Sequence, residues 1–526
     1  MQQTFKGTKA MVVSPHYLAS AAGARALARG GNAFDAAVAV SACLAVVYPH
    51  MTGLGGDAFW LVCRAGEGKV RAYNASGRSA YAATLARYAG LDAIPVRGPL
   101  AALTVPGMVD GWDAVLRQYG RLGLAEALEP AIAYAADGFP LSADQHANTA
   151  AHASVLERYP STASIYLPGG RVPKAGERFV QRQLAASLRL IAEQGRDAFY
   201  RGPIARTIAG EASEHGGLLS EDDFADHEGD WVDPITTTYR GYDVFQMPPN
   251  SQGFAALMAL NIAERFDLSA VEHGSPEYYH LLIEAIKLSF RDRNRYLTDP
   301  AFSAIPLDRL LDKAYAAELA GAIRMDRTVD VSAVPQGNDT AYAAVVDEEG
   351  NAVSFIQSLY FEFGSGVAAG DTGILLQNRG SFFSLDPNHV NRLEPHKRTF
   401  HTLAPAMALR DGKPAFVYGT QGGEGQPQTM TAVFTRMVDY GMDPLQAVSE
   451  PRWVWGRTWG APTQEVKLEG RIAPEVAEAL RKAGHQVNVV QPWDGIMGHA
   501  HAIAIDERGF PSGGADPRSD GAAIGW

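Results

Sequence analysis

The chain has 526 residues, and 46 Lys and Arg against 58 Asp and Glu give it a formal net charge of −12. This acidity argues against a nucleic-acid or anionic-membrane partner, because such binding normally shows as a basic patch. The composition, with 46% hydrophobic and 20% charged residues, is typical of a globular protein. The two cysteines, Cys43 and Cys63, are too few for a disulfide scaffold or a four-thiolate zinc site.

The N-terminal stretch Met1–Lys9 has no apolar region followed by a small-residue cleavage site, so the sequence predicts no secretory signal. The most apolar segment, Ala36–Tyr48, is shorter than a membrane span and stops at Pro49, which favours a buried core helix. We therefore expect a cytoplasmic protein without membrane contact, in which both thiols are reduced.

The first half of the chain reads mainly as helices. Ser14 can cap a helix that runs to Ala28 and stops at Gly30-Gly31-Asn32, and Asn32 can begin the Ala/Val-rich helix. Short strands are predicted at Phe59–Cys63 and Val70–Tyr73. Helical spacing recurs in five further segments: Gly107–Tyr119, Leu124–Ala136, Gln181–Glu193, Gly253–Phe266 and Glu277–Tyr296.

The second half, after a Pro/Gly/Asn-bearing connection near residue 330, reads mainly as strands. Thr340–Val346 and Ala352–Tyr360 flank the turn Asp347–Asn351, which predicts a β-hairpin. Helices and strands mix without regular alternation, which favours antiparallel sheets covered by helices. Further β-like runs lie at Gly373–Leu376, Ala404–Leu409 and Ala415–Tyr418, before a helix near Gln428–Tyr440.

Two motifs suggest cofactor or metal sites and are rejected. Gly53-Leu-Gly-Gly-Asp-Ala58 matches the dinucleotide fingerprint as a string, but a helix precedes it and a strand follows it, the reverse of what that site requires. His499-Ala-His501 would place two rings on one face of a strand, and a metal pair is the less favoured interpretation. We expect no cofactor and no metal.

Three short segments are hard to explain as packing alone. Arg78 sits in a Gly/Ser turn after a strand, Thr340 stands where a loop becomes a strand, and a glycine cluster, Gly419–Gly425, separates a strand from a helix. Each has an ordinary alternative: a solvated charge, a strand residue or a chain reversal. Taken together, they suggest a resemblance to a known family.

Several stretches resemble the γ-glutamyltranspeptidases in order along essentially the whole chain. The first residues of the family's small subunit resemble Asp339–Ser354, and Phe363–Asn378 follows the same pattern. Three segments of the first half and the C-terminal segment also match: Gly53–Asp57, Val105–Trp112, Glu129–Phe139 and Gly513–Gly525.

The resemblance implies an α+β fold of the N-terminal-nucleophile hydrolase type, with two stacked antiparallel sheets between helical layers (αββα). It also implies an inactive precursor that cuts itself before a nucleophilic threonine. Here that bond joins Asp339 to Thr340, so residues 1–339 would form a large subunit and residues 340–526 a small subunit of one intertwined domain.

The implied chemistry explains the cut. A threonine hydroxyl is a weak nucleophile without a base. Cleavage frees the α-amino group of Thr340 to act as that base, because the pKa of a chain-terminal amine is about 8. Gly422 and Gly423 match the family's pair of backbone donors for the oxyanion. Ser358 falls where the family has a second hydroxyl that hydrogen-bonds the nucleophile.

In the glutathione-cleaving members, the substrate's α-carboxylate is held by an arginine and paired serines. Arg78 matches that arginine, and a bidentate grip on a carboxylate suits a guanidinium. The serine pair is replaced by His401-Thr402.

The ammonium site of those members is not matched. In Asn378-Arg-Gly-Ser-Phe-Phe-Ser384, Arg379 stands at the family's Gln position and Phe382 at its Asp position, and Tyr360 replaces an Asn. A cation and an aromatic ring there would repel an ammonium group. We therefore expect a small anionic amide whose acyl part has a carboxylate but no α-amino group.

The branch with these replacements resembles oxamate amidohydrolase, and cephalosporin-acylase-like members acting on glutaryl amides also lack the amino group. A γ-glutamyl hydrolase or transpeptidase with an unusual amino site is the alternative, and a non-catalytic protein that kept the fold is disfavoured. The balance of hydrolysis over transfer stays open, as does the oligomeric state, with a homo-oligomer among the options.

Overall fold

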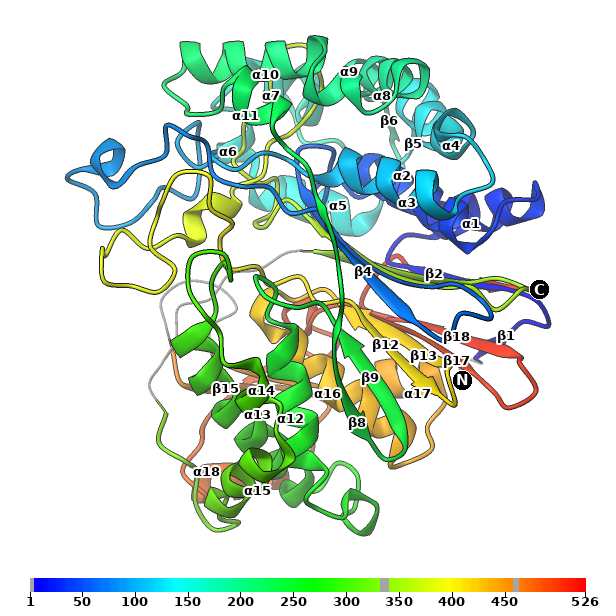
Figure 1. Cartoon of the computed structure of the whole chain (residues 1–526), viewed down its shortest axis with the longest axis vertical. Helices are drawn as coiled ribbons and strands as arrows, with labels where there is room; N and C mark the ends of the chain where they lie inside the picture. The colour runs from blue at the N-terminus through cyan, green and yellow to red at the C-terminus, as the bar shows by residue number, and fades with distance from the viewer. Residues whose placement is uncertain (1–3, 332–339, 457–462) are drawn as a thin grey trace.

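The computed structural model of the protein describes residues 4–331, 340–456 and 463–526, so Asp339 lies outside the described residues. Two stacked antiparallel sheets occupy the middle, and helices cover both outer faces (Figure 1). The four-layer αββα arrangement implied by the sequence resemblance is therefore confirmed.

Each of the two large sheets has seven strands. The lower sheet in Figure 1 contains, in spatial order, β1 (Phe5–Lys6), β18 (Pro511–Ala515), β17 (Ala500–Ile505), β13 (Lys413–Thr420), β12 (Ala406–Arg410), β9 (Tyr242–Gln246) and β8 (Ile235–Tyr239). The upper sheet contains β19 (Ala522–Gly525), β2 (Met11–Ser14), β10 (Ala341–Val346), β11 (Ala352–Ser358), β3 (Asp57–Cys63), β4 (Val70–Asn74) and β7 (Asp230–Val232).

The upper sheet is covered by helices from the first half of the chain (Figure 1). They are α1 (Tyr17–Ala28), α2 (Ala33–Val47), α3 (Met108–Tyr119), α4 (Leu124–Asp137), α5 (Ala143–Ala151), α6 (Ala153–Leu156), α7 (Pro160–Tyr166), α8 (Arg182–Gln194), α9 (Asp197–Tyr200), α10 (Pro203–Glu214) and α11 (Glu221–Ala225). A two-stranded ribbon accompanies them, formed by β5 (Phe139–Pro140) and β6 (Arg178–Phe179).

The lower sheet is covered by helices from both halves. They are α12 (Gly253–Ala263), α13 (Pro276–Tyr296), α14 (Leu307–Leu310), α15 (Lys313–Ala322), α16 (Gln426–Val438), α17 (Pro444–Ser449) and α18 (Pro474–Lys482). A small mixed sheet lies beside them, formed by β14 (Trp453–Trp455), β15 (Glu465–Glu469) and β16 (Gln486–Val490).

The Ala/Val-rich helix is the core helix that the sequence predicts. All fifteen residues of α2 are buried, and Asn32 and Asp35 form a reciprocal capping box at its start. The cap predicted for the preceding helix is wrong. His16, not Ser14, caps α1, since its ring accepts the Leu18 amide while Ser14 still belongs to β2.

The predicted hairpin is confirmed and lies at the centre of the upper sheet. β10 and β11 pair with Ala341 opposite Gln357, and β2 and β3 flank them. One sheet therefore combines strands from both sides of Thr340: β2 lies between β19 and β10, and β11 pairs with β3. The strand expected at Gly373–Leu376 is wrong, because this segment makes only isolated bridges to neighbouring loops.

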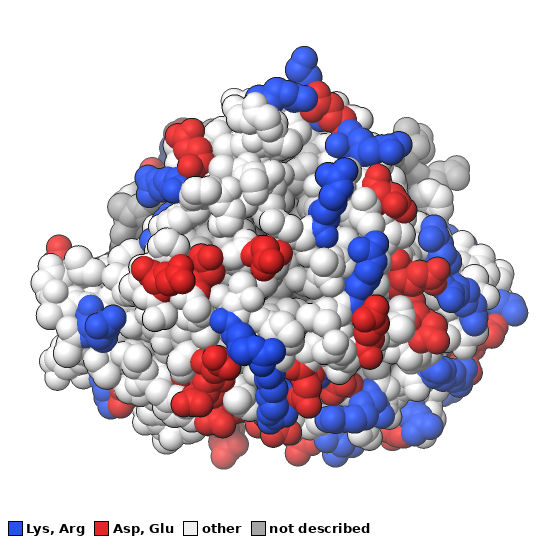
Figure 2. Space-filling model, turned by 90° about the horizontal axis from the view of Figure 1, so that it is seen from above, with Lys and Arg blue, Asp and Glu red and all other residues white. Residues whose placement is uncertain are grey.

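The face over the upper helices mixes charges of both signs. In the described part of this face, Lys and Arg lie interspersed with Asp and Glu, and no large area has a single sign (Figure 2). Within the described ranges, none of the helices combines the length and the apolar character that crossing a bilayer requires. The positive charges that matter for the site are found inside the protein instead.

Candidate active site

Thr340 lies directly before the central strand β10 and is fully buried. Gln426, the first residue of α16, donates from Nε2 to Thr340 Oγ1 over 3.3 Å. The Oε1 atom of the same amide accepts the Ala404 backbone N–H over 3.0 Å, which fixes its orientation. Gln426 thus ties the predicted nucleophile to the segment that precedes β12.

Ser358 ends β11, one position beyond the residue opposite Ala341. Continuing this antiparallel register places Ser358 opposite Thr340 on the neighbouring strand. Its hydroxyl accepts the Tyr360 backbone N–H over 2.7 Å. The two predicted hydroxyl residues therefore lie on adjoining strands.

The predicted oxyanion donors occupy the turn between β13 and α16. Gly422 and Gly423 have φ values of +125° and +52°, a backbone conformation that favours glycine. The turn leads directly into α16, whose N-terminal end favours negative charge. This geometry suits backbone amides that stabilise an oxyanion.

A hydrogen-bonded bridge supports this turn, and the sequence reasoning assigned it no role. Gln252 Nε2 donates to the carbonyl oxygens of Gly423 and Thr402, over 2.9 and 2.7 Å. Arg293 Nη1 donates to Gln252 Oε1 over 2.8 Å, and Arg293 Nη2 lies 2.5 Å from Glu424 Oε2. The bridge joins the glycine turn to the segment that contains His401 and Thr402.

Arg379 is the most unusual cation in the site. It is 1% exposed, and its Nη1 donates to Thr402 Oγ1 over 3.2 Å. Its Nε and Nη2 atoms have no hydrogen-bond partner among the residues that the structure describes. Burial lowers the pKa of Arg379 to about 10, so the guanidinium is still positively charged at neutral pH. These two nitrogens form one edge of the guanidinium, the fork that binds a carboxylate.

Two aromatic rings flank this guanidinium. The Arg379 Cζ atom lies 4.2 Å from the centre of the Tyr360 ring and 5.7 Å from that of Phe382. Tyr360 has a φ of +85°, which is strained for a non-glycine residue. The strained turn brings the Tyr360 ring onto Arg379, so that it stabilises the buried charge.

Asp57 forms a second buried centre that the sequence reasoning missed. Its side chain is fully buried, and Oδ2 lies 3.2 Å from His401 Nε2. Its Oδ1 accepts the backbone N–H groups of Gly77 and Gly107, each over 3.1 Å. The predicted residue His401 is thus held by a carboxylate from the start of β3.

The charge state of this pair follows from its surroundings. Burial lowers the pKa of His401 well below its usual value, and Arg379 lowers it further. His401 is therefore neutral, with Nε2–H donating to Asp57 and Nδ1 accepting the Leu403 N–H over 3.3 Å. Burial raises the pKa of Asp57 to about 6, and the Arg379 charge and the glycine amides oppose this shift.

Arg78, the predicted carboxylate-binding residue, contacts two residues of the segment around β7. Its guanidinium lies 3.5 Å from Asp230 Oδ2, and its Nη1 donates to the Glu228 carbonyl over 3.4 Å. Its backbone borders the site, since the neighbouring Gly77 amide holds Asp57. A role for Arg78 in substrate binding stays a prediction.

One buried group within the described chain has ligand atoms close enough to hold a metal ion. It consists of His280, Glu284 and His485. His280 Nδ1 lies 2.8 Å from His485 Nε2, and Lys287 Nζ lies 3.1 Å from both Glu284 Oε1 and His485 Nδ1. The ammonium group opposes a cation here, so this group is better described as a hydrogen-bonded chain.

The two histidines of His499-Ala-His501 make separate hydrogen bonds. His499 Nδ1 lies 3.0 Å from the Tyr48 hydroxyl, whereas His501 Nδ1 accepts the Asp516 backbone N–H over 3.2 Å. Both rings are buried, and burial lowers the pKa of each. Their contacts fit buried core histidines.

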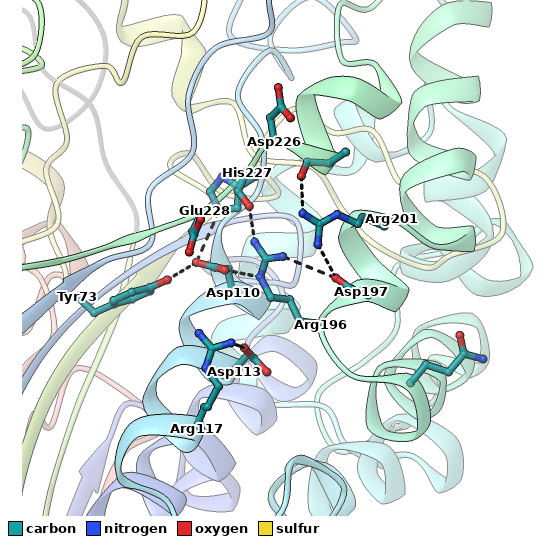
Figure 3. A pocket seen from close by; sticks show the side chains of 12 residues that line it. Tyr73, Asp110, Asp113, Arg117, Arg196, Asp197, Arg201, Asp226, His227 and Glu228 are labelled. Carbon is teal, nitrogen blue, oxygen red and sulfur yellow. Dashed lines mark hydrogen bonds and ion pairs between the residues drawn. The ribbon is translucent and has the colours of Figure 1, made fainter.

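A polar cavity of about 580 Å³ opens next to α3, α9 and α11 (Figure 3). Its three arginines are each paired with a carboxylate, so that their charges are neutralised locally. The pairs are Arg196 with Asp110, Arg201 with Asp197, and Arg117 with Asp113. By contrast, the Nε and Nη2 atoms of Arg379 have no hydrogen-bond partner in the described chain.

Comparison with known proteins is consistent with these features. The family model described as Gamma-glutamyltranspeptidase matches residues 19–526. The chain belongs to this family. It is therefore an enzyme of the N-terminal-nucleophile amidohydrolase class, as the sequence resemblance predicts.

Several relatives match over their full length. The chain is 61% identical to the glutathione hydrolase-like YwrD proenzyme of Bacillus subtilis and 43% identical to the oxamate amidohydrolase proenzyme of Klebsiella pneumoniae, over 100% of each chain. The solved cephalosporin acylase from Bacillus halodurans superimposes with a TM-score of 0.93 at 37% identity, covering 100% of this chain and 97% of that one.

The contact between Gln426 and Thr340 gives a direct test. We expect Gln426→Met to lower turnover per folded enzyme by about tenfold or more, because the nucleophile loses an orienting donor. Gln428→Met is the matched control. Gln428 is equally buried on the same helix, and in the described part of the chain its side chain bonds the Trp455 backbone. Equal losses of turnover in the two variants would contradict a specific role for Gln426.

Proposed function

We propose that this protein is a self-processing amidohydrolase that hydrolyses a small amide whose acyl part has a carboxylate. The reaction would pass through an ester on Thr340. The observation that supports this substrate class best is Arg379, a buried guanidinium whose Nε–Nη2 edge has no partner in the described part of the chain.

The proposed cycle begins when the free α-amino group of Thr340 accepts the hydroxyl proton. The Oγ1 atom attacks the amide carbonyl, and the amides of Gly422 and Gly423 stabilise the resulting oxyanion. The C–N bond then breaks, and the departing amine takes up the proton from the α-ammonium group. The acyl group remains on Thr340 as an ester. A water molecule then gives a proton to the α-amino group and attacks the ester carbonyl. The bond between the acyl carbon and Oγ1 breaks, Oγ1 takes the proton back from the α-ammonium group, and the acid is released.

The carboxylate of the acyl part would bind the Nε–Nη2 edge of Arg379. Two parallel N–H···O bonds fix both the position and the orientation of a carboxylate. The same positive charge repels an α-ammonium group, and the neighbouring rings of Tyr360 and Phe382 offer no anion to hold one. This distinguishes an oxamate-like acyl group from a γ-glutamyl group.

The comparisons support this proposal at the level of chemistry. A relative at 43% identity is named an oxamate amidohydrolase, and a solved structure of the same fold is named a cephalosporin acylase. Activity on a glutaryl amide is the nearest alternative. A second candidate is hydrolysis or transfer of γ-glutamyl groups, favoured by the glutathione hydrolase-like name of the relative at 61% identity.

We further propose that the chain is cut between Asp339 and Thr340 into large and small subunits. The YwrD and oxamate amidohydrolase relatives are both named proenzymes, which supports a precursor here. The upper sheet contains strands from both sides of Thr340, and their pairing would keep the two subunits together after cleavage.

Self-cleavage can be tested on a denaturing gel. Purified wild-type protein should convert into two bands, whereas Thr340→Ala should remain a single band and lack amidase activity. Thr340→Ser keeps a hydroxyl and should retain slow conversion. An active wild-type protein that persists as one band would refute the maturation mechanism.

Specificity can be tested by exchanging the residues at the ammonium position. The double substitution Arg379→Gln with Phe382→Asp should raise turnover of γ-glutamyl amides and lower that of oxamate or glutaryl amides, measured by released ammonia. The physical reason is that a repelling cation is removed and an anion is introduced. No gain with γ-glutamyl amides would remove the main support for this account of specificity.

A further inference from the structure

Four charged side chains are buried in the candidate site, and each is at most 1% exposed. They are Asp57, Arg293, Arg379 and Glu424. Burying charges is tolerated only where each has a partner or hydrogen bonds. The way in which these four groups are paired therefore decides which charge is left for a ligand.

The two carboxylates already have partners. Asp57 accepts hydrogen bonds from His401 and from two glycine amides. Glu424 forms a buried ion pair with Arg293, with 2.5 Å between Oε2 and Nη2. Arg293 is itself held in place by Gln252 and lies 3.7 Å from the centre of the Phe290 ring.

Glu424 acts on both arginines. Its charge raises the pKa of Arg293 and also that of Arg379, in each case against the lowering caused by burial. In a poorly screened interior, a carboxylate that lost its ion pair with Arg293 would be attracted to the next guanidinium. That guanidinium is Arg379, whose Nε–Nη2 edge has no hydrogen-bond partner in the described ranges.

We propose that Arg293 is a specificity-determining positioning residue, which pairs with Glu424 and so leaves the Nε–Nη2 edge of Arg379 for the substrate's carboxylate. The inference rests on the proposed function, because it requires an anionic acyl group at Arg379. Arg293 belongs to α13, whereas Glu424 and Arg379 lie beyond Thr340, so the specificity of the site depends on both proposed subunits.

Removing the charge of Arg293, and then the charges of both Arg293 and Glu424, distinguishes a positioning role of Arg293 from a role in packing alone. The readout is the inhibition constant of oxalate, malonate and glutarate, which needs only an amide that the enzyme turns over. Arg293→Gln should weaken inhibition by about tenfold or more, because Glu424 then competes for Arg379. Adding Glu424→Gln should restore inhibition to within about threefold of wild type, because the competing charge is gone.

Two further variants serve as controls. Arg293→Lys keeps the positive charge and should bind the dicarboxylates within about threefold of wild type. Arg436→Gln removes an equally buried arginine of α16 that bonds the Ala447 and Pro451 carbonyls, and it should leave inhibition unchanged. Folding of every variant is checked by circular dichroism and thermal unfolding.

The outcomes distinguish the inference from the proposed function. If the double variant binds no more tightly than Arg293→Gln, or if Arg436→Gln causes the same loss, the role of Arg293 is overturned. If dicarboxylates do not inhibit wild type and Arg379→Gln changes nothing, the proposed function fails, and this inference fails with it.

Discussion

The site depends on the guanidinium of Arg379, a buried cation whose Nε–Nη2 edge has no hydrogen-bond partner in the described part of the chain. Removing a cation from water is costly, and among the described residues the Thr402 hydroxyl, two aromatic rings and the charges of Asp57 and Glu424 offset part of that cost. A carboxylate bound to this edge would add two charge-assisted hydrogen bonds, each worth roughly 1.5–3 kcal/mol. Asp57 is hydrogen-bonded to His401 and Glu424 is ion-paired with Arg293, which is why the ligand proposed for Arg379 is an anion.

Close backbone approaches make this arrangement possible. A Cβ atom at Gly77 would lie 1.6 Å from the Val105 carbonyl oxygen, and one at Gly107 would lie 1.3 Å from that of Ala75. Only glycine therefore allows these two amides to reach Asp57 together. The chain has 54 glycines, and this explanation applies to Gly77 and Gly107.

Local patterns in the sequence predicted several of the elements around the candidate site. The hairpin of β10 and β11, the buried helix α2 and the glycine turn after β13 each follow from spacing within a few residues. The resemblance to a family then brought Arg379 and Thr402 into one expected site, and the structure places them in hydrogen-bond contact.

The supporting contacts could not be predicted in this way, because their partners are far apart in the chain. His401 meets Asp57 across 344 positions, and Gln252 meets Gly423 across 171. A buried Gln or Arg has no local signal that separates it from an exposed one. Likewise, no signal in the sequence indicates that Arg78 lies beside Asp230.

The central claim is that a buried arginine selects an anionic acyl group, and a pair of nearly isosteric amides tests it most directly. Oxamate and oxamide differ in one carboxylate, as do glutaramate and glutaramide. For the pair that is turned over, kcat/KM should favour the acid by about a hundredfold or more. This preference should disappear in Arg379→Gln. Equal kcat/KM for acid and diamide in the wild-type enzyme would contradict the account.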